Sequence, residues 1–140
     1  MKIGHIENGI VLDHITAGNS MNIYNVLKLG ELDCTVALIK NADSPKMGKK
    51  DIIKISTHMD IDLDILGYLD PGITVNIIRD GEVAERRTLA LPQRVVGVIQ
   101  CKNPRCITSV EREIVHEFKL TDPVKKVYRC VYCEQAAPRR

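Results

Sequence analysis

Apolar and polar positions alternate at two different periods along the first ninety residues. Residues 2–15 are apolar on both sides of Asn8-Gly9, a dipeptide that favours a type I′ turn, and this predicts a β-hairpin. Helical spacing appears twice, over residues 20–29 and 61–69, and Asp70-Pro71-Gly72 ends the second helix. Strands are predicted at 33–40, 50–56, 73–78 and 82–89, with a loop over 41–48 and a hairpin turn at Asp80-Gly81.

The order of these elements predicts the fold class. A hairpin followed by helix, two strands, helix and two strands suits an antiparallel sheet with helices on one face, a ferredoxin-like α+β sandwich. Leu91-Pro92 is the predicted boundary, which gives domains at 1–91 and 92–140. The second domain shows no helical period, and short strands at 95–100, 112–119 and 124–130 predict a small all-β unit.

Composition narrows the class of protein. Hydrophobic residues make up 44% of the chain and charged residues 27%, as in a globular protein, while aromatic residues make up only 4%, so the core must be aliphatic. No apolar run approaches the roughly 20 residues of a membrane span, and the first nine residues have no apolar signal core. We expect a cytoplasmic protein with no membrane partner.

Four cysteines in the last third form two close pairs. Cys101 and Cys106 are separated by four residues, and Cys130 and Cys133 by two. Two such pairs in a reducing compartment indicate a metal site with four thiolate ligands rather than disulfides. Iron accepts the same ligands, but one structural zinc ion suits a segment too short to bury a large core. The fifth cysteine, Cys34, lies in an apolar strand and is predicted to be a small core residue.

Other chemistry-bearing residues are less specific. Lys50 and Lys54 share one face of a predicted strand and, with Arg86, could bracket a polyphosphate, although solvated surface lysines give the same pattern. The acidic residues over 60–64 fail the calcium-loop pattern and suit a helix N-terminus. The sequence shows no nucleophile with a base and an orienting group, so the chain is not expected to be an enzyme.

Four segments together resemble a known family, the regulatory chain of aspartate carbamoyltransferase. They are V-L-D-H-I at 11–15, M-G-K-K-D-I-I-K-I at 47–55, T-V-N-I-I at 74–78, and the four cysteines with their spacing. The resemblance covers nearly the whole chain. It implies a nucleotide-binding allosteric domain followed by a zinc domain that docks to the catalytic chain.

The resemblance also implies partners. In the family, six regulatory chains, as three dimers, join two catalytic trimers, and CTP, UTP and ATP are the effectors that control pyrimidine biosynthesis. Zinc in this family supports assembly of the subunits. The nucleotide-binding positions that the resemblance implies are Ile3, His5, Ile6, Asp13, His14, Lys50, Lys54, Asn76, Ile78, Val83 and Arg86.

Two positions depart from the family pattern. Gly4 replaces a common acidic residue and Gly81 an aromatic one, which leaves open the preferred nucleotide, while Arg86 replaces a lysine and keeps its charge. Residues 92–140 carry a net charge of +5 against −3 for residues 1–91. That excess keeps an alternative open, a zinc-ribbon nucleic-acid-binding protein, but interspersed glutamates and few aromatic residues speak against a nucleic-acid partner.

Overall fold

The N-terminal part of the chain folds around one antiparallel sheet in this computed structural model, which describes residues 6–138. Its strands are β1 (Gly9–Thr16), β2 (Val36–Ser44), β3 (Gly48–Ile55), β4 (Thr74–Arg79) and β5 (Glu82–Thr88). Its helices are α1 (Ser20–Val26), the 3-10 turn η1 (Leu29–Glu31) and α2 (Leu63–Leu69). The strands lie in the order β2-β3-β1-β4-β5, so β1 is the central strand and pairs with β3 on one side and β4 on the other.

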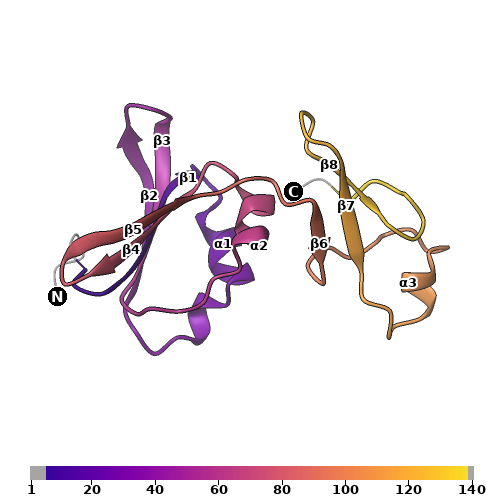
Figure 1. The fold of residues 1–140 in the computed structure, drawn as a ribbon, viewed down its shortest axis with the longest axis horizontal. Coiled ribbons are helices and arrows are strands. Elements are labelled where there is room, and N and C mark those ends of the chain that lie inside the picture. The colour runs from indigo at the N-terminus through magenta and orange to yellow at the C-terminus, as the bar shows by residue number, and fades with distance from the viewer. Residues whose placement is uncertain (1–5, 139–140) are drawn as a thin grey trace. The chain divides into compact units, whose positions relative to one another are not determined.

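Both helices cover the same face of this sheet (Figure 1). Alternate strand residues Leu12, Ile53 and Val75 point to that face and pack with Ile23 of α1 and Leu66 of α2, all at most 2% exposed. Full burial of such a side chain contributes roughly 1.5–3 kcal/mol, so this aliphatic layer holds the helices to the sheet. The predicted α+β class, with helices on one face, is confirmed. Among residues 6–138, no helix lies on the opposite face, which is called the helix-free face below.

The turn predicted at Asn8-Gly9 is wrong. Gly9 is the first residue of β1 and pairs with Ile78, and the φ of Asn8 is not positive as a type I′ turn requires. A Cβ on Gly9 would lie 2.0 Å from the carbonyl oxygen of Ile55, so close packing of β1 against β3 requires the glycine. Residues 2–5 of the other predicted arm lie outside the described residues, and residues 6–7 are not in a strand.

Several predicted boundaries shift for local reasons. β2 begins at Val36 rather than residue 33 and continues to Ser44, because a bulge near Asn41 (φ 59°) lets it keep pairing with β3 through the predicted loop. The turn at Asp80-Gly81 is confirmed, with φ values of 53° and 81°. Asp62 caps α2, its Oδ1 accepting hydrogen bonds from two backbone N–H groups, as expected for acidic residues there.

The chain divides into two compact units, Met1–Leu89 and Ala90–Arg140. The second unit has a three-stranded antiparallel sheet, β6 (Arg94–Val96), β7 (Glu117–Asp122) and β8 (Val127–Cys130), around a core of Val95, Phe118, Leu120 and Tyr128. The all-β expectation holds for the sheet, but the short helix α3 (Ile107–Val110) was not predicted, because four residues are too few to show a period. None of the helices in residues 6–138 is long and apolar enough to cross a membrane.

Candidate functional site

Four cysteines of the second unit meet in one cluster. The Sγ atoms of Cys101, Cys106, Cys130 and Cys133 all lie within 4.8 Å of one another. The distance from Cys101 Sγ to Cys133 Sγ is 3.5 Å, and that from Cys106 Sγ to Cys130 Sγ is 3.7 Å. These separations exceed the disulfide bond length of about 2.05 Å and suit the edges, about 3.8 Å, of a tetrahedron with 2.3 Å zinc–sulfur bonds.

Each pair of cysteines is held by a short structured segment. Cys101 follows β6, and its backbone N–H donates to Nδ1 of His116 at 2.9 Å. Cys106 is the N-cap residue of α3. Cys130 ends β8, and the turn after it presents Cys133, with the N–H of Glu134 bonded to the carbonyl of Cys130 at 2.8 Å. The three-stranded sheet therefore brings together pairs that are distant in sequence.

The thiols do not ionise alike. Burial raises the pKa of Cys101 to about 12 and also raises that of Cys130. A hydrogen bond from the Thr108 hydroxyl, 3.0 Å from Sγ, lowers the pKa of Cys106. Burial opposes ionisation of Cys133 as well, but hydrogen bonds from the backbone of Gln135 and the side chain of Asn103 outweigh it and lower the pKa to about 7. Thr108 was not found from sequence, although it stands only two residues after Cys106.

This donor set fits one zinc ion. All four ligand positions come from soft thiolates, three of them buried, and zinc favours four such ligands in a closed structural site. The cluster leaves no ligand position for a catalytic water, so zinc here would stabilise the fold of the second unit. The predicted zinc ligands and the single structural zinc ion agree with this geometry. Cys34 packs partly buried against the core of the first unit, as predicted.

A second set of candidate residues lies on the helix-free face of the first sheet. Lys54 pairs with Val11, Val11 with Asn76, and Asn76 with Arg86, so these residues form one row across β3, β1, β4 and β5. Lys50 lies on the same face, because β3 alternates regularly between half-buried Lys50 and Lys54 and buried Asp51 and Ile53. The structure thus brings the three predicted phosphate-binding cations to one face.

Polar partners fix several of these side chains. Nζ of Lys50 lies 2.9 Å from Oδ1 of Asp13, and Nε of Arg86 donates to Oδ1 of the buried Asn76 at 3.0 Å. Burial opposes ionisation of Asp13, but the Lys50 ammonium and the backbone N–H of His14 outweigh it and lower the pKa of this carboxyl. Asp13 is therefore charged at neutral pH, and the Arg86 side chain is oriented by Asn76.

His14 breaks the regular alternation of side chains along β1. Its φ is 59°, within a register shift between Leu12 and Ile15, and its backbone N–H bonds to Oδ1 of Asp13 at 2.7 Å. Its ring Nδ1 lies 3.1 Å from Oγ1 of Thr74 on β4. The bulge is what turns the histidine toward β4.

The remaining predicted nucleotide-binding positions fall into two groups. Val83 is half exposed and pairs with buried Ile78, which places both on the helix-free face beyond Arg86. Ile6 is 7% exposed, and the N–H of Gly81 bonds to the carbonyl of Glu7 at 2.8 Å, so the β4–β5 turn is attached to this segment. Ile3, Gly4 and His5 lie outside the described residues.

Comparisons with known proteins identify both units. Residues 1–90 match the model of the aspartate carbamoyltransferase regulatory chain, allosteric domain, and residues 93–140 match that of its metal binding domain. Proteins named aspartate carbamoyltransferase regulatory chain are 54% identical in Clostridium acetobutylicum (96% of this chain, 92% of the relative), 50% in Clostridium tetani (96% and 94%) and 44% in Bifidobacterium longum (98% and 99%). These matches confirm the resemblance drawn from the sequence and the expectation that the chain is not an enzyme.

Proposed function

This chain belongs to the family of aspartate carbamoyltransferase regulatory chains, and from that premise we propose that it binds nucleoside triphosphates on its helix-free face and transmits their effect to a catalytic chain. CTP, UTP and ATP are the proposed effectors, and the controlled step belongs to cytoplasmic pyrimidine biosynthesis. The chain would act as a regulatory dimer. Residues 1–91 would bind the nucleotide, and residues 92–140 would dock to the catalytic chain.

One observation carries the nucleotide proposal. Lys50, Lys54 and Arg86 share one face, on which the carboxylate of Asp13 is bonded to Lys50. Lys54 and Arg86 stand three inter-strand spacings apart in one row, roughly 14 Å, which is a suitable span for ribose and a phosphate chain. Cations fixed at this spacing favour a polyphosphate over a single phosphate.

Discrimination between nucleotides must come from groups near the base. CTP and ATP carry the same phosphates, so the cations bind both alike. Ile6, Ile78 and Val83 are apolar residues that lie beyond Arg86 toward the β4–β5 turn at Gly81, and Val83 is the exposed one. An effector that binds two conformations equally shifts neither, so base contacts at these residues are the proposed source of opposite effects.

The second unit has features of a docking module. Six of the eight exposed large apolar side chains among the described residues belong to it, including Ile107 and Val110 on α3 and Tyr132 between the last two zinc ligands. Exposed apolar side chains that gather in one patch are typical of protein interfaces. We propose that this surface contacts the catalytic chain and that zinc holds it in shape.

Calorimetric titration of the zinc-loaded chain with CTP and ATP tests the nucleotide site. Lys54→Ala and Arg86→Ala should each weaken both nucleotides about tenfold or more, since each removes a charge-assisted contact to phosphate. The matched control is Lys46→Ala, which removes an exposed cation in the β2–β3 turn. Equal affinity in the wild type and both site variants would exclude this face as the nucleotide site.

Transmission is tested in the complex reconstituted with a catalytic chain. CTP and ATP should change the substrate saturation curve, and a substrate analogue should change nucleotide affinity by the same factor, because coupling is reciprocal. Saturation curves that stay the same with both nucleotides would contradict the proposal. Removing zinc should release the regulatory chain from the complex.

One observation also favours the nucleic-acid alternative enough to test it. Arg94 pairs with Lys119 and Lys119 with Arg129, so three cations stand side by side across β6, β7 and β8, where like charges ordinarily destabilise a sheet. Glu117 forms an ion pair with Arg94, which reduces the excess charge. Filter binding to mixed-sequence DNA and RNA across a salt series distinguishes a nucleic-acid-binding protein from a regulatory chain. Measurable affinity that falls steeply with salt supports the nucleic-acid alternative.

A further inference from the structure

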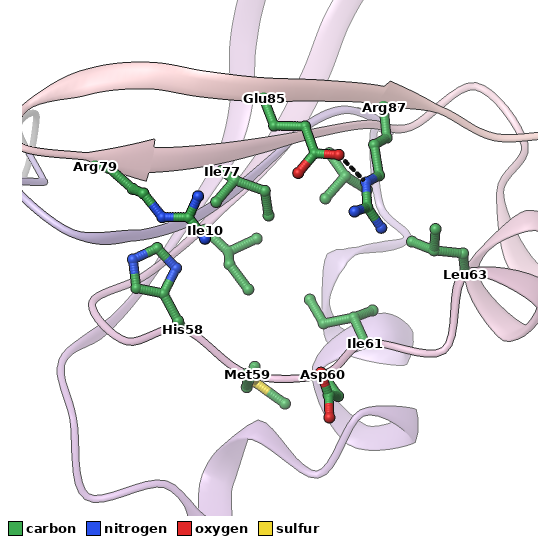
Figure 2. A pocket seen from close by; sticks show the side chains of 11 residues that line it. Ile10, His58, Met59, Asp60, Ile61, Leu63, Ile77, Arg79, Glu85 and Arg87 are labelled. Atoms are coloured by element: carbon green, nitrogen blue, oxygen red, sulfur yellow. Dashed lines mark hydrogen bonds and ion pairs between the residues drawn. The ribbon is translucent and has the colours of Figure 1, made fainter.

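Negative charge in the two units is compensated in different ways. In the first unit carboxylates meet cations: Oε1 of Glu85 lies 2.7 Å from Nε of Arg87 at the cavity beside loop 58–62 (Figure 2). In the second unit a zinc ion with four thiolate ligands would carry a net charge of −2, and three of the four cysteines are buried. Buried charge is costly unless it is hydrogen-bonded, so the donors around the sulfur atoms affect how firmly the metal is held.

Backbone N–H groups supply one set of hydrogen bonds to these sulfur atoms. In three places the donor stands two residues after the cysteine: Asn103 for Cys101, Tyr132 for Cys130 and Gln135 for Cys133. Any non-proline residue that keeps the turn after the cysteine can make such a contact. These backbone donors therefore do not depend on the type of side chain that follows each cysteine.

Two side chains add hydrogen bonds that do depend on residue type. Oγ1 of Thr108 lies 3.0 Å from Sγ of Cys106, and both residues are at most 3% exposed. A zinc-bound sulfur has lost its proton, so the hydroxyl must be the donor in the loaded site. The side-chain amide of Asn103 donates to Sγ of Cys133, while its Oδ1 accepts the backbone N–H of Arg105 at 3.0 Å. Asn103 thus links the turn between the first two ligands to the turn after β8.

From this arrangement we propose that Thr108 and Asn103 determine how tightly the cluster holds zinc, by donating hydrogen bonds to its charged sulfur atoms. The loaded cluster carries more negative charge at sulfur than the four free cysteines do, so a donor at sulfur stabilises the loaded form more. Removing such a partner of a metal ligand typically lowers metal affinity roughly 10–100-fold. This role concerns zinc alone and is independent of nucleotide binding and of docking.

Chelator competition on the full-length chain measures the contribution of Thr108. Thr108→Val keeps nearly the same side-chain shape but has no hydroxyl, and it should hold zinc about tenfold or more weaker than the wild type. Thr108→Ser keeps the hydroxyl and should stay within about threefold of the wild type. The matched control is Thr121→Val, because this exposed threonine of β7 bonds to the carbonyl of Val127 instead of a sulfur atom.

Asn103→Asp provides an independent second test. The carboxylate can still accept the N–H of Arg105, which preserves the turn, but it has no proton to donate to Cys133. Zinc should again be held about tenfold or more weaker.

Cobalt substitution separates a hydrogen bond to sulfur from a merely structural role. Co²⁺ accepts the same four thiolates, and the energy of its sulfur-to-metal charge-transfer bands reports the electron density at sulfur. At saturating cobalt these bands should move to lower energy in Thr108→Val and stay at the wild-type position in Thr108→Ser and Thr121→Val. A variant that only loosened the fold would lose affinity without this shift.

Three results would overturn the proposal. They are zinc affinities in Thr108→Val and Asn103→Asp equal to that of the wild type, a loss in Thr108→Ser as large as that in Thr108→Val, and charge-transfer bands that do not move in Thr108→Val. The second result would show that side-chain volume matters at this position and the hydroxyl does not.

Discussion

Nζ of Lys50 lies 2.9 Å from Oδ1 of Asp13, and the two side chains, only 16% and 24% exposed, join β3 to β1 on the helix-free face. This ion pair has two effects besides linking the neighbouring strands. It keeps a carboxylate charged in a partly buried position and holds one of the three cations of the proposed nucleotide site in place.

Replacing Lys50 with methionine should raise the pKa of Asp13. Without the ammonium, burial opposes the charged carboxylate with less to offset it, so the folded-state pKa moves up from its present position below 3.8. Carboxyl ¹³C shifts of Asp13 across a pH titration measure this directly. In Lys49→Met, the control, the lost partner Asp43 is exposed and the pKa of Asp13 should not move.

The same pair should make stability depend on pH. The folded-state pKa of Asp13 is lowered, so its contribution is complete above the unfolded value of about 3.9 and is lost as pH falls through the folded value. Lys50→Met should cost about 1 kcal/mol near pH 7, with a difference from the wild type that narrows below pH 4. Urea unfolding followed by circular dichroism gives both values, and a difference that is constant with pH would contradict this.

Asp51 is a buried carboxylate that organises two loops. Its Oδ2 accepts from the N–H groups of Gly18 at 3.0 Å and Ser20 at 3.3 Å, and its Oδ1 accepts from that of Asn41 at 3.0 Å. Burial opposes its charge, but the hydrogen bonds from Asn41, Ser20 and Gly18 outweigh burial and lower its pKa. Asp51 therefore fixes both the start of α1 and the bulge in β2.

Asp51→Asn should destabilise the first unit by about 2–3 kcal/mol near neutral pH. The amide turns one NH₂ group toward backbone donors and loses charge-assisted hydrogen bonds. Hydrogen exchange at Gly18, Ser20 and Asn41 should speed up in the variant. A control is Asp43→Asn, an exposed position on β2, which should change stability by less than about 0.5 kcal/mol.

Gly9→Ala should destabilise the sheet by about 2 kcal/mol or more. The added Cβ would lie 2.0 Å from the carbonyl oxygen of Ile55, so β1 and β3 must separate to admit it. Gly72→Ala is a matched control, because its Cβ would meet its nearest neighbour at an ordinary 3.7 Å. Thermal unfolding of both variants measures the difference, and equal losses would show that Gly9 is not needed for close strand packing.

Cys106→Ser should abolish stoichiometric zinc binding and unfold the second unit. A structural zinc contributes on the order of 10 kcal/mol of apparent binding free energy, far more than a unit of this size otherwise has to spare. Metal analysis should then find well under one zinc per chain, and amide signals of β6 to β8 should lose their dispersion while those of the first sheet remain. Cys34→Ser, the control, should keep one zinc per chain.

The local sequence pattern is sufficient for several features. The helices α1 and α2 show helical periods, Asp80-Gly81 is a turn in which both residues have positive φ, and the cysteine spacing alone gives the metal-ligand set. The helices and the turn depend on residues close in sequence. The metal site is predictable because paired cysteines in a reducing compartment rarely form disulfides and usually bind metal.

Other features depend on residues that meet only after folding. Asn8-Gly9 has a turn signature, yet Gly9 is needed because a carbonyl 46 positions later in the chain comes too close for a side chain. The extension of β2 through residues 41–44 required β3 as its partner, and α3 is one turn held beside a zinc ligand. Neither leaves a periodic signal.

The candidate sites divide in the same way. The sequence by itself determined which residue types were available: four thiols in two pairs, and lysines spaced evenly along one strand. Only the tertiary structure decided that Lys54, Val11, Asn76 and Arg86 stand in one row and that Asp13 binds Lys50. The reason is register: strand pairing joins residues far apart in sequence, and a shift of one residue would send each side chain to the opposite face.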